Sequence, residues 1–177
     1  CNLFRNITLG IDPKLFTYSQ LKKFFKRKNK IKLIRQNLID LIEKKKSKDN
    51  FPFFSLEKKI VGESSASKIN RISKYLKRNK SDYLYVSAPE NVAWVLNIRG
   101  KDCPNSPIPN SRLIISSSKK IILVTKVLKA KNLIKNRMLS SKEIIDDKEF
   151  QKKLSYLKGD SFIIDDRTCS IYFENLI

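Results

Sequence analysis

The stretch at residues 93–102, AWVLNIRGKD, places an Asn, an Arg, a Gly and an Asp within a short run. Arg99 carries a planar guanidinium, which can donate a fork of hydrogen bonds to a carboxyl or carbonyl group. Asp102 follows three residues later, so a surface or interdomain ion pair with Arg99, worth about 0–1 kcal/mol, is the alternative. Asn97 and Gly100 bracket a helix end, where Asn can pair with free backbone groups and Gly can adopt a positive φ. The stretch therefore predicts either a ligand-recognition loop or a structural helix cap.

Trp94 is the single tryptophan of the chain, and it stands in the helix expected before this loop. On a helix, Val92, Trp94, Val95 and Leu96 cover one side and its flanks. Large aromatic side chains dominate protein cores, so we expect Trp94 to be buried against a sheet, with its indole N–H bound to one acceptor.

The other chemistry-bearing residues predict no catalytic group and no metal ligand. The chain has no His, which excludes Ser–His and Cys–His pairs and any metal site that needs imidazole. The paired carboxylates Asp146–Asp147 and Asp165–Asp166 are interpreted as cap and turn residues. The cysteines are few, with no CxxC pair, so a disulfide framework is not expected and a reducing cytoplasmic setting fits best. Their positions are Cys1, Cys103 and Cys169.

The elements that must position this stretch alternate between helix and strand. The segment 62–80 predicts a helix capped at Ser64 or Ser65, with Ile69, Ile72 and Leu76 at helical spacing. Pro89 suits the first turn of a helix over 90–98. The order helix, strand, helix, strand, strand, helix, strand, helix, strand predicts an α/β fold with a mixed β-sheet flanked by helices. The remaining expected elements are strands 82–89, 112–116, 119–125, 143–146 and 160–166, and helices 127–139, 146–159 and 168–177.

Residues 1–60 predict shorter pieces. They are a strand at 6–13, a helix at 20–28 capped by Thr17 or Ser19, a strand at 31–34, a helix at 37–46 with Leu38, Leu41 and Ile42 inward, and a linker at 44–54.

The net charge of +21 and the pI near 10.0 leave two interpretations open. One is a basic nucleic-acid-binding module that uses the Lys-rich helices at 20–32 and 68–80. The other is composition drift, because Lys far exceeds Arg and because Lys, Ile and Asn are read by A/T-rich codons. We favour the second, since specific phosphate and base readers use Arg forks. The apolar runs are too short to cross a bilayer, so no membrane partner is expected.

The run from Ala88 to Pro107 resembles the second domain of the three-domain Xaa-Pro aminopeptidases (aminopeptidase P, of the creatinase/prolidase clan). Weaker likeness extends to LGIDP and QNLIDLI before it and to DSFIIDDRTCSIYFENLI after it. Two departures are Ser106, where the family has Asn, and Pro109 with Asn110, where aromatic residues are usual. The matching residues are Ala88, Glu90, Val92, Ala93, Trp94, Leu96, Asn97, Ile98, Arg99, Gly100, Asp102 and Pro107.

The resemblance implies a creatinase/prolidase N-terminal domain fold with a ribonuclease H-like motif at 61–177, preceded by part of a similar first domain at 1–60. The family's chemistry lies in a separate catalytic domain of pita-bread fold, where Asp, His and Glu side chains hold two divalent metals, usually manganese. Since this chain lacks His and stops where that domain would begin, the resemblance implies the non-catalytic N-terminal part of such an enzyme, inactive alone. An inactive remnant of a split peptidase gene is a further alternative.

The resemblance also implies roles for individual residues. Arg99, Asn97 and Asp102 are expected near the substrate cleft, where peptides with proline second would enter. Trp94, Gly100 and Pro107 are expected to be structural, with a wall of the peptide pocket as the alternative for Trp94. Expected partners are the catalytic domain, the peptide substrates and a second copy in a homodimer, in the cytoplasm.

Overall fold

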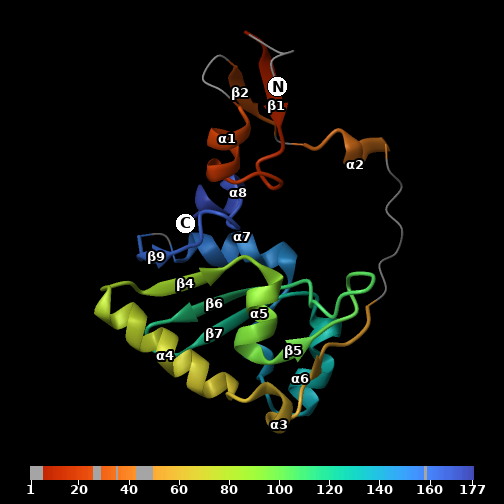
Figure 1. Ribbon diagram of the computed structural model, residues 1–177, viewed down its shortest axis with the longest axis vertical. Coiled ribbons are helices and arrows are strands. Elements are labelled where there is room, and N and C mark those ends of the chain that lie inside the picture. Colours follow the sequence, from red (N-terminus) through yellow and green to blue (C-terminus); the bar gives the residue numbers. More distant parts are fainter. Residues whose placement is uncertain (1–5, 26–28, 35, 43–49, 158) are drawn as a thin grey trace. The chain divides into compact units, whose positions relative to one another are not determined.

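The computed structural model describes residues 6–25, 29–34, 36–42, 50–157 and 159–177. Its contacts form two compact units (Figure 1). Unit 1 comprises Cys1–Lys48 and Asp166–Leu176, and unit 2 comprises Asp49–Asp165 and Ile177. The domain boundary after residue 60 that the sequence suggests stays a prediction.

The elements follow the chain in the order shown in Figure 1. Those of unit 1 are β1 Thr8–Ile11, α1 Tyr18–Phe24, β2 Lys30–Leu33, α2 Ile39–Ile42 and α8 Ile171–Glu174. The strands of unit 2 are β3 Phe54–Ser55, β4 Tyr83–Val86, β5 Ile98–Arg99, β6 Arg112–Ser116, β7 Ile121–Val124, β8 Ile144–Ile145 and β9 Phe162–Ile163. Its helices are α3 Lys58–Val61, α4 Ser65–Arg78, α5 Pro89–Leu96, α6 Lys131–Lys135 and α7 Asp147–Ser155, with 3₁₀ turns η1 Val127–Ala130 and η2 Ser141–Glu143.

The centre of unit 2 is a five-stranded mixed sheet with the order β8-β7-β6-β4-β9. The strands β4, β6 and β7 are antiparallel neighbours, whereas β8 and β9 join the two edges in parallel. The hairpin expected at 112–125 is formed by β6 and β7. The prediction of an α/β fold with a mixed sheet and flanking helices is therefore confirmed.

Helices cover both faces of this sheet, because successive side chains of a strand point to opposite sides. On one face, Val86 and Leu113 belong to a core cluster with Val92 and Val95 of α5, and Ile72 of α4 packs against it. On the other face, Tyr85 contacts Phe150 of α7, with ring centroids 5.6 Å apart. This arrangement fixes α4 and α5 side by side, and the end of α5 carries the stretch that the sequence singled out.

Unit 1 contains a two-stranded parallel sheet of β1 and β2. Helix α1 begins with a capping box, in which Thr17 Oγ1 accepts from Gln20 N and Gln20 Oε1 accepts from Thr17 N. The prediction that Leu38, Leu41 and Ile42 face inward is wrong, because these side chains are between 61% and 82% exposed. Helical spacing gives them a shared face, but such a face is buried only where another element packs against it. Residues 43–46 of the helix expected at 37–46 lie outside the described residues.

The segment expected to be a linker is partly core. Phe53 is fully buried, its backbone N donates to Lys129 O at 2.7 Å, and β3 pairs with β5. The residues before Pro52 are rich in charge, which masks the signal of this short strand. The prediction of a linker is wrong for residues 53 and 54. Residues 44–49 of the expected linker lie outside the described residues.

Candidate functional site: the turn that follows helix α5

Helix α5 ends in a left-handed residue. Pro89 stands in its first turn, where the missing N–H costs no hydrogen bond, and Asn97 closes it with φ 54° and ψ 36°. Asn tolerates this conformation better than most residues with a side chain. The positive φ expected at Gly100 is thus found at Asn97.

A buried lysine holds this helix end. Lys68 of α4 is 2% exposed, and its Nζ donates to Trp94 O and to Asn97 Oδ1, both at 2.6 Å. Asn97 Nδ2 in turn donates to Glu63 O at 2.9 Å. A cation at a helix C-terminus is favourable, because the free carbonyls carry partial negative charge. Burial nevertheless lowers the pKa of Lys68, Glu63 opposes this shift, and Arg99 and Arg71 add to it.

Arg99 is half-buried, and its guanidinium turns back to the same helix. Nη1 donates to Ala93 O at 3.2 Å and to Ile98 O at 2.8 Å. Within the described residues, both of these hydrogen bonds use Nη1, so Nε and Nη2 are the donors that a ligand carboxyl or carbonyl would meet. The side chain is therefore held in one orientation at the start of the loop.

Asp102 pairs with Lys129 and not with Arg99, which corrects the ion pair that the spacing allowed. The side chains of Lys129 and Asp102 are only 7% and 6% exposed. Asp102 Oδ2 also accepts from Asn110 N at 2.6 Å. Both oxygens of the Asp102 carboxylate are therefore used in contacts that hold the loop together. The burial of this carboxylate argues against direct contact with a substrate.

Gly100 is required by close packing. A Cβ there would lie 2.8 Å from Pro109 Cα and 3.2 Å from Ile108 O, both backbone atoms that cannot move aside easily. Its N–H donates to Pro107 O at 3.0 Å. The structural role expected of Gly100 thus has a steric cause, and Pro107 contributes its carbonyl.

Trp94 is 50% exposed, so the prediction of a buried core tryptophan is wrong. Its helical neighbours Val92, Val95 and Leu96 fill the core, while Trp94 points away from it. Lys68 Nζ lies 4.2 Å from its ring centroid and Arg71 Cζ 5.8 Å from it. These two cations interact favourably with the π-face of the Trp94 ring and so stabilise it in an exposed position. The hydrophobic effect alone would favour its burial.

Sequence reasoning missed Lys68 and Lys129, the two lysines that hold the ends of this loop. The chain contains 29 lysines, and nothing in their local sequence separates these two from the solvated ones. A weak signal existed for Lys68, which precedes Ile69 and Ile72 on a helix with a strong apolar face and therefore lies at the edge of that face.

The described residues contain no group of three or more His, Cys, Asp or Glu side chains that could hold a metal ion. Asp146 is the N-cap of α7, as the cap interpretation expected. Asp147 instead lies in the first turn of α7 and forms an ion pair with Arg112 at 2.8 Å. Cys103 is exposed and Cys169 buried, and Cys1 lies outside the described residues.

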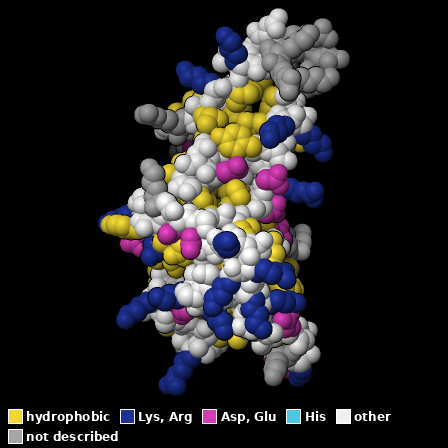
Figure 2. Space-filling view, turned by 90° about the vertical axis from the view of Figure 1, so that its left-hand side faces the viewer, with side chains coloured by type: hydrophobic (Ala, Val, Ile, Leu, Met, Phe, Trp, Pro, Cys, Tyr) yellow, Lys and Arg dark blue, Asp and Glu magenta, His cyan; other side chains and the backbone are white. Residues whose placement is uncertain are grey.

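Positive charge gathers on the face of unit 2 that bears α4. Figure 2 shows many Lys and Arg side chains there and few Asp and Glu. The exposed cations of α4 and the turn that follows it are Arg71, Lys74, Lys77, Arg78 and Lys80.

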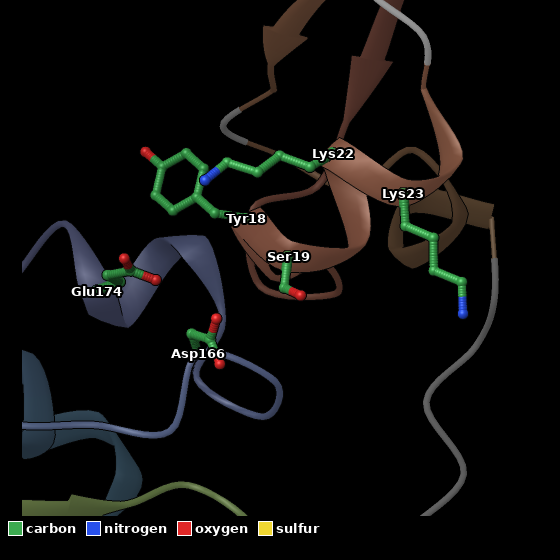
Figure 3. Close-up of a pocket in the computed structure, with 6 residues that line it drawn as sticks. All are labelled: Tyr18, Ser19, Lys22, Lys23, Asp166 and Glu174. Atoms are coloured by element: carbon green, nitrogen blue, oxygen red, sulfur yellow. The ribbon is translucent and has the colours of Figure 1, made fainter.

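Unit 1 contains a separate open hollow of about 450 Å³. Figure 3 shows Lys22 and Lys23 of α1 diverging to opposite sides, with the carboxylates of Asp166 and Glu174 on the other wall. Because its cations do not converge on one point, the hollow does not form a catalytic arrangement. Its lining is Tyr18, Ser19, Lys22, Lys23, Asp166 and Glu174.

No helix in the described part of the chain is long and apolar enough to traverse a lipid bilayer.

Comparison with known proteins connects this fold to a family. The family model for the creatinase/prolidase N-terminal domain matches residues 43–177, which is more than half of the chain. Xaa-Pro aminopeptidase 1 of Dictyostelium discoideum is 31% identical over 136 residues, which cover 70% of this chain and 22% of the relative. A probable Xaa-Pro aminopeptidase P of Botryotinia fuckeliana is 28% identical over 123 residues, covering 66% and 19%.

A solved structure supports the same fold. The X-prolyl aminopeptidase from Caenorhabditis elegans, described as a cytosolic enzyme with a di-nuclear active site, matches with a TM-score of 0.75 at 24% identity. The match covers 92% of this chain and 28% of the nematode chain. The chain spans about a fifth of the length of the curated relatives it matches. Because the family model matches more than half of the chain, the chain belongs to the creatinase/prolidase N-terminal domain family.

Proposed function

We propose that this chain is the non-catalytic N-terminal region of a metal-dependent Xaa-Pro aminopeptidase, an enzyme that releases the N-terminal residue from peptides with proline second. In this proposal residues 1–60 end a first domain and 61–177 form a second, similar one. The catalytic domain of pita-bread fold is its partner in the same enzyme and would hold two divalent metals, with manganese as the expected ion. The setting is cytoplasmic, and a homodimer is the expected assembly.

Within that enzyme, we assign to the loop 97–107 the shaping of access to the active-site cleft. The observation that carries this assignment is the orientation of Arg99, whose Nη1 is fixed on Ala93 O and Ile98 O. A guanidinium held in advance loses little conformational entropy when a carbonyl or carboxyl binds to its remaining donors. Asn97, bound to Lys68, and Asp102, bound to Lys129, hold the backbone on either side of Arg99, and we assign them a positioning role.

The test is a chimera in which this chain replaces the corresponding region of the nematode enzyme. We expect the chain alone to hydrolyse no X-Pro peptide in the presence of Mn²⁺, and the chimera to be active. Arg99→Ala in the chimera should raise KM or lower kcat about tenfold or more, as loss of a charged hydrogen bond does. Lys142→Ala, which removes an exposed cation outside the loop, is the control.

Three results would count against the proposal. Turnover by the isolated chain would remove its non-catalytic role. A chimera that folds but lacks activity would favour the inactive remnant of a split peptidase gene. Equal kinetics for Arg99→Ala and the parent chimera would remove the role of the loop.

A further inference from the structure

Arginine is concentrated beside the single tryptophan. The chain has 9 Arg against 29 Lys, so Lys is the default cation of its surface. Three of those arginines, Arg71, Arg78 and Arg99, belong to α4 or to the strand that follows α5. The other six arginines are spread over the rest of the chain, so Arg is a larger share of the cations in α4 and β5 than in the chain as a whole.

Two arginines and a tyrosine form one stripe on α4. Arg71, Tyr75 and Arg78 are separated by four and three residues, so they lie on the same side of the helix. All three are exposed, Tyr75 to 50%. The inward side of α4 is a different set, which includes Leu76 at zero exposure.

Trp94 extends this stripe from the neighbouring helix. Its ring lies 5.8 Å from Arg71 Cζ, and α4 and α5 are held together by the bond from Lys68 Nζ to Trp94 O. We call Arg71, Tyr75, Arg78 and Trp94 the α4–α5 face. Trp, Tyr and Arg are the residue types that carry most binding energy in protein interfaces.

The side chains of Trp94 and Arg71 are held in place by contacts within the chain. Lys68 lies over the Trp94 ring at 4.2 Å, and Glu63 Oε2 accepts from Arg71 Nη2 at 2.9 Å. Side chains that already hold their bound orientation lose less entropy on association. A face of this kind favours a specific contact over a solvated, mobile surface.

The charge of the face specifies its partner. Glu63 contacts this face, and its carboxylate is already bound to Arg71 and to Ser67 Oγ. The exposed Lys74 and Lys77 on the same helix add further positive charge (Figure 2). Complementarity therefore calls for a surface with carboxylates around an apolar side chain.

We propose that the α4–α5 face is the docking site for an acidic segment of the catalytic domain, with an apolar side chain against Trp94 and carboxylates at Arg71 and Arg78. The proposal rests on the proposed function, which supplies that domain. Single-stranded nucleic acid would also use aromatic and Arg side chains. It is the competing occupant, and the comparison with oligo(dT) below distinguishes it from an acidic protein segment.

The single tryptophan makes the test direct, since selective excitation reports Trp94 alone. The 177-residue chain is titrated at fixed ionic strength with an acetylated peptide rich in Glu and Asp that contains Leu. We expect saturable change in the emission of Trp94. The double variant Arg71→Met/Arg78→Met should weaken binding about fivefold or more, as loss of two partly exposed charge pairs does. Circular dichroism confirms that each variant is folded.

The matched control removes the same charge elsewhere. Lys142→Met/Lys148→Met neutralises two exposed cations outside the face and should change the binding constant less than about twofold, since it alters only the screened long-range field. Trp94→Ala, followed by calorimetry, should also weaken binding.

Several outcomes would overturn the proposal. They are an unchanged Trp94 emission, equal loss in the two double variants, or tighter binding of oligo(dT) of the same net charge than of the acidic peptide. The titration involves no peptide hydrolysis, so it can fail while the chimera described above remains active. An inactive chimera with an intact acidic-peptide response would remove the proposed function and leave the face as a protein-docking site.

Discussion

At the scale of single residues, Asn97 connects the end of α5 to the side chain of Lys68 and to the backbone of Glu63. Its side chain accepts from Lys68 and donates to Glu63 O, while its own φ of 54° ends helix α5. Two separable effects are present, the left-handed backbone and the side-chain hydrogen bonds. Variants that remove one or both should therefore differ in stability.

We expect Asn97→Ala to lower the free energy of unfolding by about 2–4 kcal/mol, because it leaves a buried ammonium short of an acceptor and strains the backbone. Asn97→Gly keeps the backbone relaxed and should cost about 1 kcal/mol less. Urea denaturation measures both. Identical midpoints for the two variants would contradict a contribution from the left-handed conformation.

The buried pair of Asp102 and Lys129 supports a second prediction. Removing one partner leaves an uncompensated charge, so Lys129→Met should destabilise by about 3–5 kcal/mol. Asp102→Asn keeps an acceptor for Asn110 N but removes the charge, with a similar expected loss.

The double variant Asp102→Asn/Lys129→Met should lose less than the sum of the two single variants, by about 2 kcal/mol or more. Residues in contact couple in this way. A double-mutant cycle of urea midpoints measures the difference. Simple additivity would show that the two side chains do not form a pair in solution.

At the scale of elements, β9 is attached to the central sheet by an exposed carboxylate. Asp82 Oδ2 accepts from Ser161 N and from Ser161 Oγ, each at 2.9 Å. The pKa of Asp82 is lowered below its usual 3.8. The backbone hydrogen bond from Ser161 is the larger cause, and the hydrogen bond from the Ser161 side chain is the smaller one. Both bonds favour the ionised form.

The sign of the resulting pH dependence follows from that direction. A carboxyl whose pKa is lower in the folded state stabilises the fold above its unfolded pKa, and the contribution is lost as the pH falls below 3.8 through the folded pKa. Asp82→Asn should therefore lower the urea midpoint at neutral pH, with the difference from the parent shrinking in acid. Asp160→Asn, also exposed, is the control. A difference that persists unchanged in acid would contradict this assignment.

The order of helices and strands in unit 2 could be predicted from the sequence, because each element has its own signal. Ser64 caps α4, Pro89 opens α5, and two short continuous runs of apolar, largely β-branched residues mark the hairpin of β6 and β7. The two-residue strands β3 and β5 were missed, since a strand that short has no periodicity to detect.

The candidate site was predictable only in part. The run from Asn97 to Pro107 could be found because it follows the single tryptophan and resembles the second domain of the Xaa-Pro aminopeptidases. The direction of Trp94 was predicted wrongly, because a general preference for burial does not say which of four adjacent apolar residues faces the core. The partners of Asp102 and Asn97 come from distant segments, and local sequence does not contain that information.

At the scale of the whole molecule, the two units differ in how much of their backbone is protected. In unit 2, β6 lies inside a five-stranded sheet, and Leu113 and Ile115 are fully buried. In unit 1, β1 and β2 form a sheet of two strands with Leu33 exposed. Two-stranded sheets are marginal by themselves, so local opening should be easier there.

Hydrogen exchange of the full chain tests this difference. We expect the amides of β6 and β7 to exchange slowest and those of β1 and β2 to exchange at least about tenfold faster, which corresponds to a difference in opening free energy of about 1.4 kcal/mol or more. Equal protection in the two sheets would show that the units open together.

The burial of two lysine side chains has a practical consequence for chemical labelling of this lysine-rich chain. Among the described lysines, Lys68 and Lys129 are the buried ones, and the ammonium group of each binds acceptors inside the protein. A reagent that acylates amines should therefore label the folded chain heavily while sparing these two positions. The time at which acylated Lys68 appears in the mass spectrum would report when the turn after α5 separates from α4.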